Sequence, residues 1–196
     1  MGSIIFWLVL LAAVIYIISI YNQLVTLKNR FKNAFAQIEV QLKRRYDLIP
    51  NLVETAKGYL AHERETLDAV VTARNDAAAV LKALEGGNLG GADLSKLASA
   101  ENALQGALGK LNVTMEAYPD LKASDNMMQL TEELTTTENR IAFARQGFND
   151  AVMSYNTYRQ SFPPVFFAAR FGHPEDAQLL EFDDTAQIQA APKVEF

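Results

Sequence analysis

The residue types that catalyse reactions or bind metal ions are scarce in this chain of 196 residues, which has no cysteine and two histidines, His62 and His173. A zinc-binding helix needs a second histidine one turn away, and His62 has none. Helical Glu-x-x-His pairs, which di-iron bundles use, are absent because position 59 is tyrosine. No serine stands in a Gly-x-Ser-x-Gly turn. We therefore expect a protein that is not an enzyme and that uses no metal, no cofactor and no small-molecule substrate.

The glycine-rich segment 86–91 has the composition of a phosphate-binding loop without its chemistry. It reads Gly-Gly-Asn-Leu-Gly-Gly and lacks the Lys-Ser/Thr pair of a Walker motif. We predict a flexible turn there.

Two charged residues, Arg74 and Glu101, occupy positions at which the helical pattern of the chain calls for apolar ones, and a third, Arg140, stands next to Ile141 of the last apolar seam. If the chain folds back at segment 86–91 and again near Leu121, all three reach the same level of a helical bundle. Such a layer could bind a ligand or act as a switch. We expect instead a buried ion-pair layer that fixes the register of the helices, because such layers specify pairing while adding little stability.

The elements that must position these residues are helices. From residue 24 to residue 158, apolar residues recur every three or four positions, a mean period of about 3.6. Prolines end two of the helical stretches, at Pro119 and at Pro163-Pro164. No segment alternates with the period of a strand. The sequence therefore predicts an all-α fold in which residues 22–160 form an antiparallel, up-and-down bundle. The first apolar seam comprises Leu24, Leu27, Phe31, Phe35, Ile38, Leu42, Tyr46 and Ile49.

The number of helices depends on the stretch from Asp47 to Pro50. Asp47 could cap a new helix with Pro50 in its first turn, which gives four helices, and we favour this interpretation. The second helix would then overrun the membrane surface, and the apolar seam keeps its phase across Pro50. The alternative is three long helices, of which the first is kinked at Pro50 but continuous.

The N-terminal residues 1–21 have the composition of a transmembrane anchor. The stretch from Ile4 to Ile20 carries no charge, and its seventeen residues span roughly 26 Å as a helix, close to the thickness of the bilayer's hydrocarbon core. Trp7 and Tyr21 lie where interfacial aromatic residues are expected. A cleaved signal peptide is the competing interpretation, but no basic region precedes the stretch and no Ala-x-Ala site follows it.

The basic residues predict the orientation of this anchor. No charged side chain precedes the apolar stretch, whereas Lys28, Arg30 and Lys32 follow it, close enough to touch anionic lipid. We therefore expect the N-terminus outside and the bulk of the chain in the cytoplasm, at the inner membrane. A second basic cluster, Lys43-Arg44-Arg45, would lie about 34 Å from Tyr21 along a helix. We expect it to be a solvated helix end that partly neutralises the helix dipole.

The C-terminal part divides into two segments. Residues 161–172 contain proline and are rich in aromatic residues, and Phe162, Phe166, Phe167 and Phe171 are candidate contacts with a partner or a second subunit. Residues 173–196 form an acidic tail, which we expect to be flexible. The chain has 18 Lys/Arg and 23 Asp/Glu, and six of those acids but only one lysine lie in this tail. The rest is therefore balanced in charge, which argues against nucleic acid as a partner.

One long stretch from Gln41 to Tyr59, QLKRRYDLIPNLVETAKGY, is a specific string without recognisable chemistry. Shorter pieces accompany it in order: Tyr21-Asn22-x-Leu24-Val25, Tyr118-Pro119-Asp120-Leu121-Lys122-Ala123, Glu138-Asn139-Arg140-Ile141 and Tyr155-Asn156. In these residues the chain resembles the LemA family of bacterial membrane-anchored helical proteins. The resemblance implies a four-helix up-and-down bundle, and it implies no defined reaction.

Three functions follow as expectations. The first is a membrane-anchored, non-enzymatic scaffold that forms homo-oligomers, with the lipid bilayer as its second partner. The second is an adaptor or regulator of an envelope-stress membrane protease, which the family resemblance suggests and which would require a membrane protein partner. The third is a membrane-shaping module, because a magnetosome membrane protein resembles the same family.

Overall fold

The computed structural model describes residues 1–85 and 89–182, and every regular element in this part of the chain is helical. The all-α prediction is confirmed. The elements are α1 (Gly2–Lys57), α2 (Arg64–Leu84), α3 (Gly91–Glu116), α4 (Pro119–Lys122), α5 (Asp125–Gln160), α6 (Val165–Ala168) and the 3-10 turn η1 (Ala169–Phe171).

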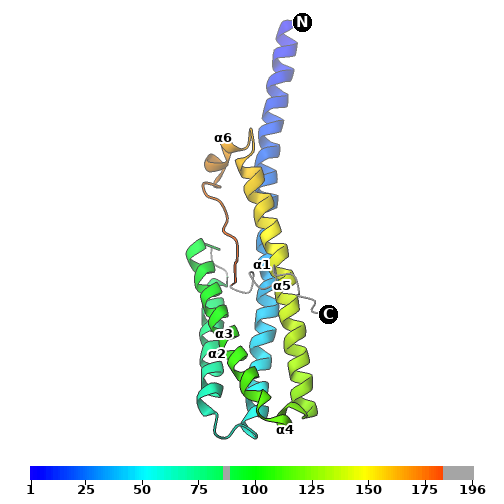
Figure 1. Ribbon diagram of the computed structural model, residues 1–196. Helices are drawn as coiled ribbons and strands as arrows, with labels where there is room; N and C mark the ends of the chain where they lie inside the picture. Colours follow the sequence, from blue (N-terminus) through cyan, green and yellow to red (C-terminus); the bar gives the residue numbers. More distant parts are fainter. Residues whose placement is uncertain (86–88, 183–196) are drawn as a thin grey trace, which may run out of the picture.

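Helix α1 is the spine of the molecule (Figure 1). Its N-terminal part projects alone beyond the other elements, and its C-terminal part packs antiparallel to α5 along most of the length of α5. The hairpin of α2 and α3 packs beside the lower half of this pair, so that four long helices form an up-and-down bundle. The short helix α4 joins α3 to α5 at the end of the bundle farthest from the N-terminus.

The predicted turn at Asp47 is wrong, although the four helices are confirmed. Helix α1 continues through Pro50 and ends at Lys57. The reversal lies at residues 58–63, where the N–H groups of Tyr59 and Leu60 both donate to the carbonyl of Ala56, at 3.0 and 2.9 Å. Leu60 is fully buried in the turn and holds it against the core. Since α2 then ends beside Lys43, it does not reach the anchor.

Every residue of the predicted first seam is buried, and the same phase continues through Val53 and Ala56. Opposite this seam, α5 contributes Phe148 and Tyr155, whose rings meet the ring of Phe31 edge-on at 6.4 and 5.2 Å. Aromatic pairs of this geometry add to the stabilisation that burial alone provides. The unbroken helical period across Pro50 is therefore the pattern of one continuous helix with one buried face.

The chain after η1 covers the part of the α1–α5 pair that α2 and α3 do not reach (Figure 1). Residues 173–182 run extended along α5, and His173, Leu180 and Phe182 are buried. Our expectation of a flexible tail is therefore corrected for residues 173–182. The rest of the acidic tail, 183–196, lies outside the described residues, as do 86–88 of the glycine-rich segment.

Candidate functional site

A buried polar cluster lies at the middle of the bundle and centres on Glu101 of α3, which is 2% exposed. Its carboxylate pairs with the guanidinium of Arg45 and accepts a hydrogen bond from the hydroxyl of Tyr46, both on α1. A buried carboxylate is tolerated only when it is paired in this way. The cluster therefore joins α1 to α3 through side chains that water does not reach.

Arg74 joins α2 to the same cluster through the backbone. In a regular helix the N–H of residue 50 would donate to the carbonyl of Tyr46, but Pro50 has no N–H. The Nε–H of Arg74 donates to this carbonyl instead, at 2.9 Å. The contact explains how a helix interior accommodates a proline and why an arginine stands on the apolar seam of α2.

Arg140 does not belong to this layer, so the three-residue prediction is corrected. Arg74 and Glu101 do lie near one another, each in contact with Tyr46. On α5, Ile141 and Thr137 face the core, and Arg140 is exposed beside them. The charge that balances Glu101 comes from Arg45, which sequence reasoning had assigned to a solvated helix end.

The basic triplet of α1 contacts all three of the other long helices. Lys43 pairs with Glu85 at the end of α2 at 2.5 Å, Arg44 lies 3.9 Å from Glu133 of α5, and Arg45 pairs with Glu101 of α3. Successive residues of a helix point about 100° apart, so three neighbours can reach three different partners. The hydrogen bond between Lys43 and Glu85 raises the pKa of the lysine and lowers that of the glutamate. The triplet thus links α1 to each of the other three long helices, and only the pair of Arg45 with Glu101 is buried.

Burial raises the pKa of Tyr46 to about 12, although the nearby Arg45 and Arg74 oppose the shift. The phenol therefore stays protonated at neutral pH and donates to Glu101 rather than acting as a base. Arg45 and Glu101 are both buried, as is usual for a polar contact that joins packed helices.

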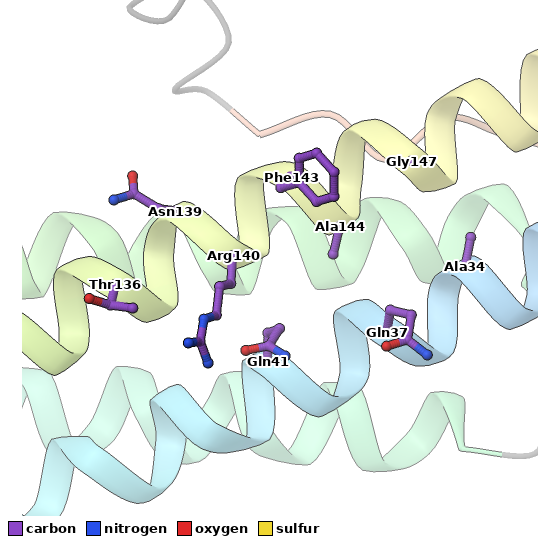
Figure 2. A pocket seen from close by; sticks show the side chains of 9 residues that line it. All are labelled: Ala34, Gln37, Gln41, Thr136, Asn139, Arg140, Phe143, Ala144 and Gly147. Atoms are coloured by element: carbon purple, nitrogen blue, oxygen red, sulfur yellow. The ribbon is translucent and has the colours of Figure 1, made fainter.

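A shallow groove of about 580 Å³ lies between α1 and α5, outside this cluster (Figure 2). Arg140 points from α5 toward α1, where Gln41 and Gln37 line the other wall. Small residues, Ala34, Ala144 and Gly147, leave the space open. Phe143 stands at the rim and is 80% exposed. The groove and the ring of Phe143 therefore form one continuous, partly apolar surface on this face of the bundle.

Two asparagines of α5 that lie seven residues apart form hydrogen bonds with the backbone of the extended segment 173–182. Asn149 donates to the carbonyl of Leu180 at 3.1 Å and accepts from its N–H at 2.9 Å. Asn156 makes the same pair of bonds with Ala177, both at 2.9 Å. Each amide therefore pairs with the backbone of the segment as a neighbouring strand would.

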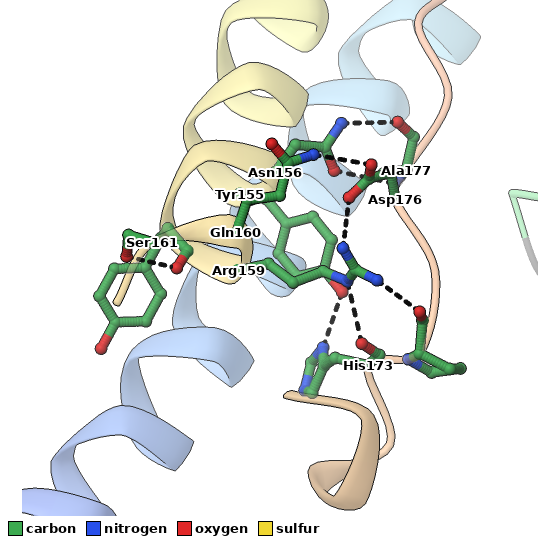
Figure 3. Close-up of polar contacts among 10 residues, drawn as sticks. Tyr155, Asn156, Arg159, Gln160, Ser161, His173, Asp176 and Ala177 are labelled. Carbon is green, nitrogen blue, oxygen red and sulfur yellow. Dashed lines mark hydrogen bonds and ion pairs between the residues drawn. The ribbon is translucent and has the colours of Figure 1, made fainter. Parts of the chain in front are cut away.

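Arg159 and Tyr155 hold the beginning of the same segment (Figure 3). Arg159 donates to the carbonyls of His173 and Pro174 and pairs with Asp176 at 2.6 Å. The hydroxyl of Tyr155 lies 2.9 Å from Nδ1 of His173. Burial lowers the pKa of His173, and the charges of Lys28 and Arg159 lower it further. His173 is therefore neutral at pH 7.

The aromatic residues of 161–172 divide into two groups. The rings of Phe167 and Phe171 stack at 5.9 Å and are half-buried, and Phe171 also meets Tyr21 edge-on at 5.4 Å. Phe162 and Phe166 point outward. The turn after α5 thus packs beside α1 at Tyr21, the residue at which we expect the membrane anchor to end.

The other residues assigned to the membrane lie on α1. Trp7 is exposed within the projecting part, and Arg30 and Lys32 are exposed below it, with Lys28 half-buried. An 18-residue stretch of α1 has a mean hydropathy of 2.7, and only 6% of it is buried in the chain. Its length and composition indicate a single membrane anchor.

Among the described residues, no three His, Asp or Glu side chains gather as a metal site. The residues that sequence reasoning missed are Arg45, Tyr46, Asn149 and Arg159. Asn156 had been noted only as part of a motif. The seven-residue spacing of Asn149 and Asn156 on one face of a predicted helix was the available signal.

These features define an antiparallel four-helix bundle built directly onto a long apolar N-terminal helix, with polar side chains that join its elements to one another. The chain belongs to the LemA family, whose model matches residues 34–196.

Relatives in bacteria are similar over most of this chain. Protein LemA of Metamycoplasma hominis is 28% identical over 138 residues, which cover 69% of this chain and 58% of that protein. Magnetosome protein MamQ of Magnetospirillum gryphiswaldense is 25% identical over 163 residues, which cover 76% of this chain and 60% of the relative. Magnetosome protein MamQ 2 of Paramagnetospirillum magneticum is 26% identical over 166 residues, with the same two coverages. The chain therefore spans about three fifths of the length of the curated relatives it matches.

Proposed function

We propose that this protein is a non-enzymatic scaffold, anchored in the bacterial inner membrane by α1, that associates with further copies of itself at the cytoplasmic face. The observation that carries the proposal is the surface formed by Phe143 and the groove between α1 and α5. An exposed ring and an open groove on one face suit a two-fold symmetric contact, because each copy offers both a projection and a recess. The groove volume of about 580 Å³ has ample room for a phenyl ring.

A second feature of the groove supports the same contact. The side-chain oxygen of Gln41 is buried and has no hydrogen-bond partner within the described chain. If the Gln41 amide turns into the groove, a donor from a second copy would satisfy this oxygen. The unbroken helix α1 supports the scaffold role, since it fixes the bundle to the anchor without a hinge.

The test is the native mass of the full chain in mild detergent and in lipid nanodiscs. We expect discrete multimers, and we expect Phe143→Lys to reduce them to monomers because it places a charge in the contact. Met153→Lys, which alters another exposed apolar residue of α5, is the matched control and should leave the multimers intact. A monomer in both media would refute self-association. Co-purification of one stoichiometric membrane protein would favour the adaptor function instead.

Membrane shaping is the second candidate. It is favoured by the exposed aromatic side chains at the level of the anchor and by the relatives that are magnetosome proteins. Deformation of liposomes by the purified full chain would support it, and liposomes of unchanged shape would count against it.

A further inference from the structure

The turn after α5 has one apolar side that no described residue covers. Phe162 is 80% exposed, Phe166 67% and Val165 48%, and the rings of Phe162 and Phe166 meet edge-on at 5.8 Å. The opposite side, with Pro164 and Ala168, is buried against the rest of the chain. The segment is therefore held firmly from beneath while it presents a small aromatic surface outward.

The position of this aromatic surface relative to the membrane-spanning part of α1 indicates what covers it. Ile20 is the first buried residue of α1, and the preceding stretch from Ile4 to Ile18 is almost entirely exposed. The contact between Tyr21 and Phe171 places the turn at the same level (Figure 1). The aromatic surface thus lies where the membrane-spanning part of α1 ends, and it continues the exposed apolar surface of that helix.

The charges around this surface suit a bilayer and not an acidic partner. Residues 161–172 contain Arg170 and no acidic residue, and α1 has none before Glu39. The acidic residues begin at Glu175, on the segment that runs away from the anchor. Aromatic rings flanked by basic side chains are typical of the headgroup region of anionic membranes.

We propose that Phe162, Val165 and Phe166 insert into the headgroup and upper acyl region of the leaflet that α1 enters, as a second membrane contact of this chain. The proposal rests on α1 as the anchor. A helix alone can rotate and tilt in a bilayer, and an interfacial aromatic anchor displaced from its axis restricts both motions. The second contact therefore fixes how the bundle stands on the membrane.

The absence of cysteine from the chain allows a direct test with single probes. Full-length Phe162→Cys and Phe166→Cys are labelled with an environment-sensitive nitrobenzoxadiazole dye and reconstituted in phosphatidylethanolamine and phosphatidylglycerol vesicles. We expect blue-shifted emission at both positions and quenching by spin labels near the top of the acyl chains that is several-fold stronger than at a control site. The control is Val113→Cys, which is 70% exposed on α3 near the end of the bundle far from the anchor.

Two results would overturn the proposal. If aqueous iodide quenches the Phe162 and Phe166 probes as strongly as the Val113 probe, the surface is in water. If neither iodide nor the lipid spin labels reach them, a second copy or another protein covers the surface. Failure of self-association leaves this test intact, because lipid quenching is read from a single chain.

Discussion

At the residue scale, Glu101 is the group on which the interior of the bundle depends. Its carboxylate pairs with Arg45 and accepts a hydrogen bond from Tyr46, so one buried acid joins three polar side chains. Removal of one member of a buried pair costs more than the pair contributes, because the other charge stays in a medium of low polarity. The expected role is structural, as it was for the layer inferred from the sequence.

Replacement of Glu101 by Ala should lower the free energy of unfolding by about 3–5 kcal/mol, since the guanidinium of Arg45 then lacks its counter-charge. The measurement is urea unfolding of the full chain in detergent, followed by helical circular dichroism. Glu132→Ala, an exposed position on α5, serves as the control and should change little. If the Glu101→Ala variant unfolds like the natural chain, by urea or by heat, the buried cluster does not stabilise the bundle.

Tyr46 should make the free energy of unfolding fall at alkaline pH. Its pKa is raised from 10.0 to about 12 in the folded chain, so the unfolded chain loses this proton first as the pH rises. The contribution is therefore complete below pH 10 and disappears as the pH approaches 12. Over this interval we expect the free energy of unfolding to fall by roughly 2–3 kcal/mol on account of this residue.

Tyr46→Phe cannot lose that proton, so its free energy of unfolding should fall less steeply across the same interval. Burial also raises the pKa of Tyr155, which leaves some dependence in the variant. Unfolding at several pH values between 9 and 12 provides the comparison. Parallel curves for the variant and the natural chain would contradict the assignment.

At the element scale, the continuity of α1 through Pro50 depends on a contact from another helix. The proline leaves the carbonyl of Tyr46 without its usual donor, and Arg74 supplies one from α2. The changes in the free energy of unfolding caused by substituting Pro50 and Arg74 should therefore be coupled. A double-mutant cycle measures this coupling directly.

We expect Pro50→Ala alone to stabilise the bundle, because alanine restores the helical hydrogen bond and has a higher helix propensity. Arg74→Ala alone should destabilise it, and should cost less in the Pro50→Ala background, with a coupling of about 1 kcal/mol. Asn75→Ala, which removes the other hydrogen-bond partner of Arg74, is the control and should show no coupling to Pro50. If the effects of the two substitutions on the free energy of unfolding are additive, the hydrogen bond from Arg74 to the carbonyl of Tyr46 does not compensate for Pro50.

The same contact explains what could be predicted from the sequence. The seams of period 3.6 gave the helical class and the buried residues, because side-chain burial repeats along one helix face. The turn was placed at Asp47 because a local pattern of Asp followed by Pro is typical of a helix start. The donor that permits a proline inside the helix lies on the next helix, and such a tertiary contact has no local signature. Arg45 was misassigned for the same reason, since an arginine beside an expected helix end gives no sign of burial.

The contact of segment 173–182 with α5 should weaken at acidic pH, because His173 then takes up a proton. The pKa of this histidine is lowered from 6.5 by burial and by Lys28 and Arg159, so the docked segment favours the neutral ring. The docking energy is therefore complete above pH 6.5 and is lost as the pH falls through the lowered value. The hydroxyl of Tyr155 faces the same ring and adds no charge.

We expect amide hydrogen exchange at Ala177 and Leu180, corrected for its intrinsic pH dependence, to accelerate between pH 7 and pH 5 in the full chain. His173→Phe keeps a ring against Tyr155 but cannot take up a proton, so it should remove the acceleration. His62→Gln, at the other and exposed histidine, should retain it. Equal pH profiles in the natural chain and the His173 variant would show that this group does not control the contact.

At the scale of the whole molecule, α1 is both anchor and bundle helix, so the bundle cannot swing independently of its anchor. Between Tyr21 and Lys57 the helix has a length of about 54 Å, which sets the height of the far end of the bundle above an upright anchor. Helix α2 does not overrun the membrane surface, because it ends beside Lys43. The region next to the membrane is completed by α5 and the extended segment instead.

The basic residues that follow the apolar stretch predict the orientation of α1 across the membrane. Lys28, Arg30 and Lys32 follow the apolar stretch and no charged side chain precedes it, so the N-terminus should face out and the bundle the cytoplasm. In intact cells, a membrane-impermeant maleimide should label Ser3→Cys in the otherwise cysteine-free chain. Ser99→Cys, exposed on α3, should react only after the membrane is permeabilised. The reverse pattern would place the bundle outside the cytoplasm and would move the proposed contact of Phe162 and Phe166 to the outer leaflet.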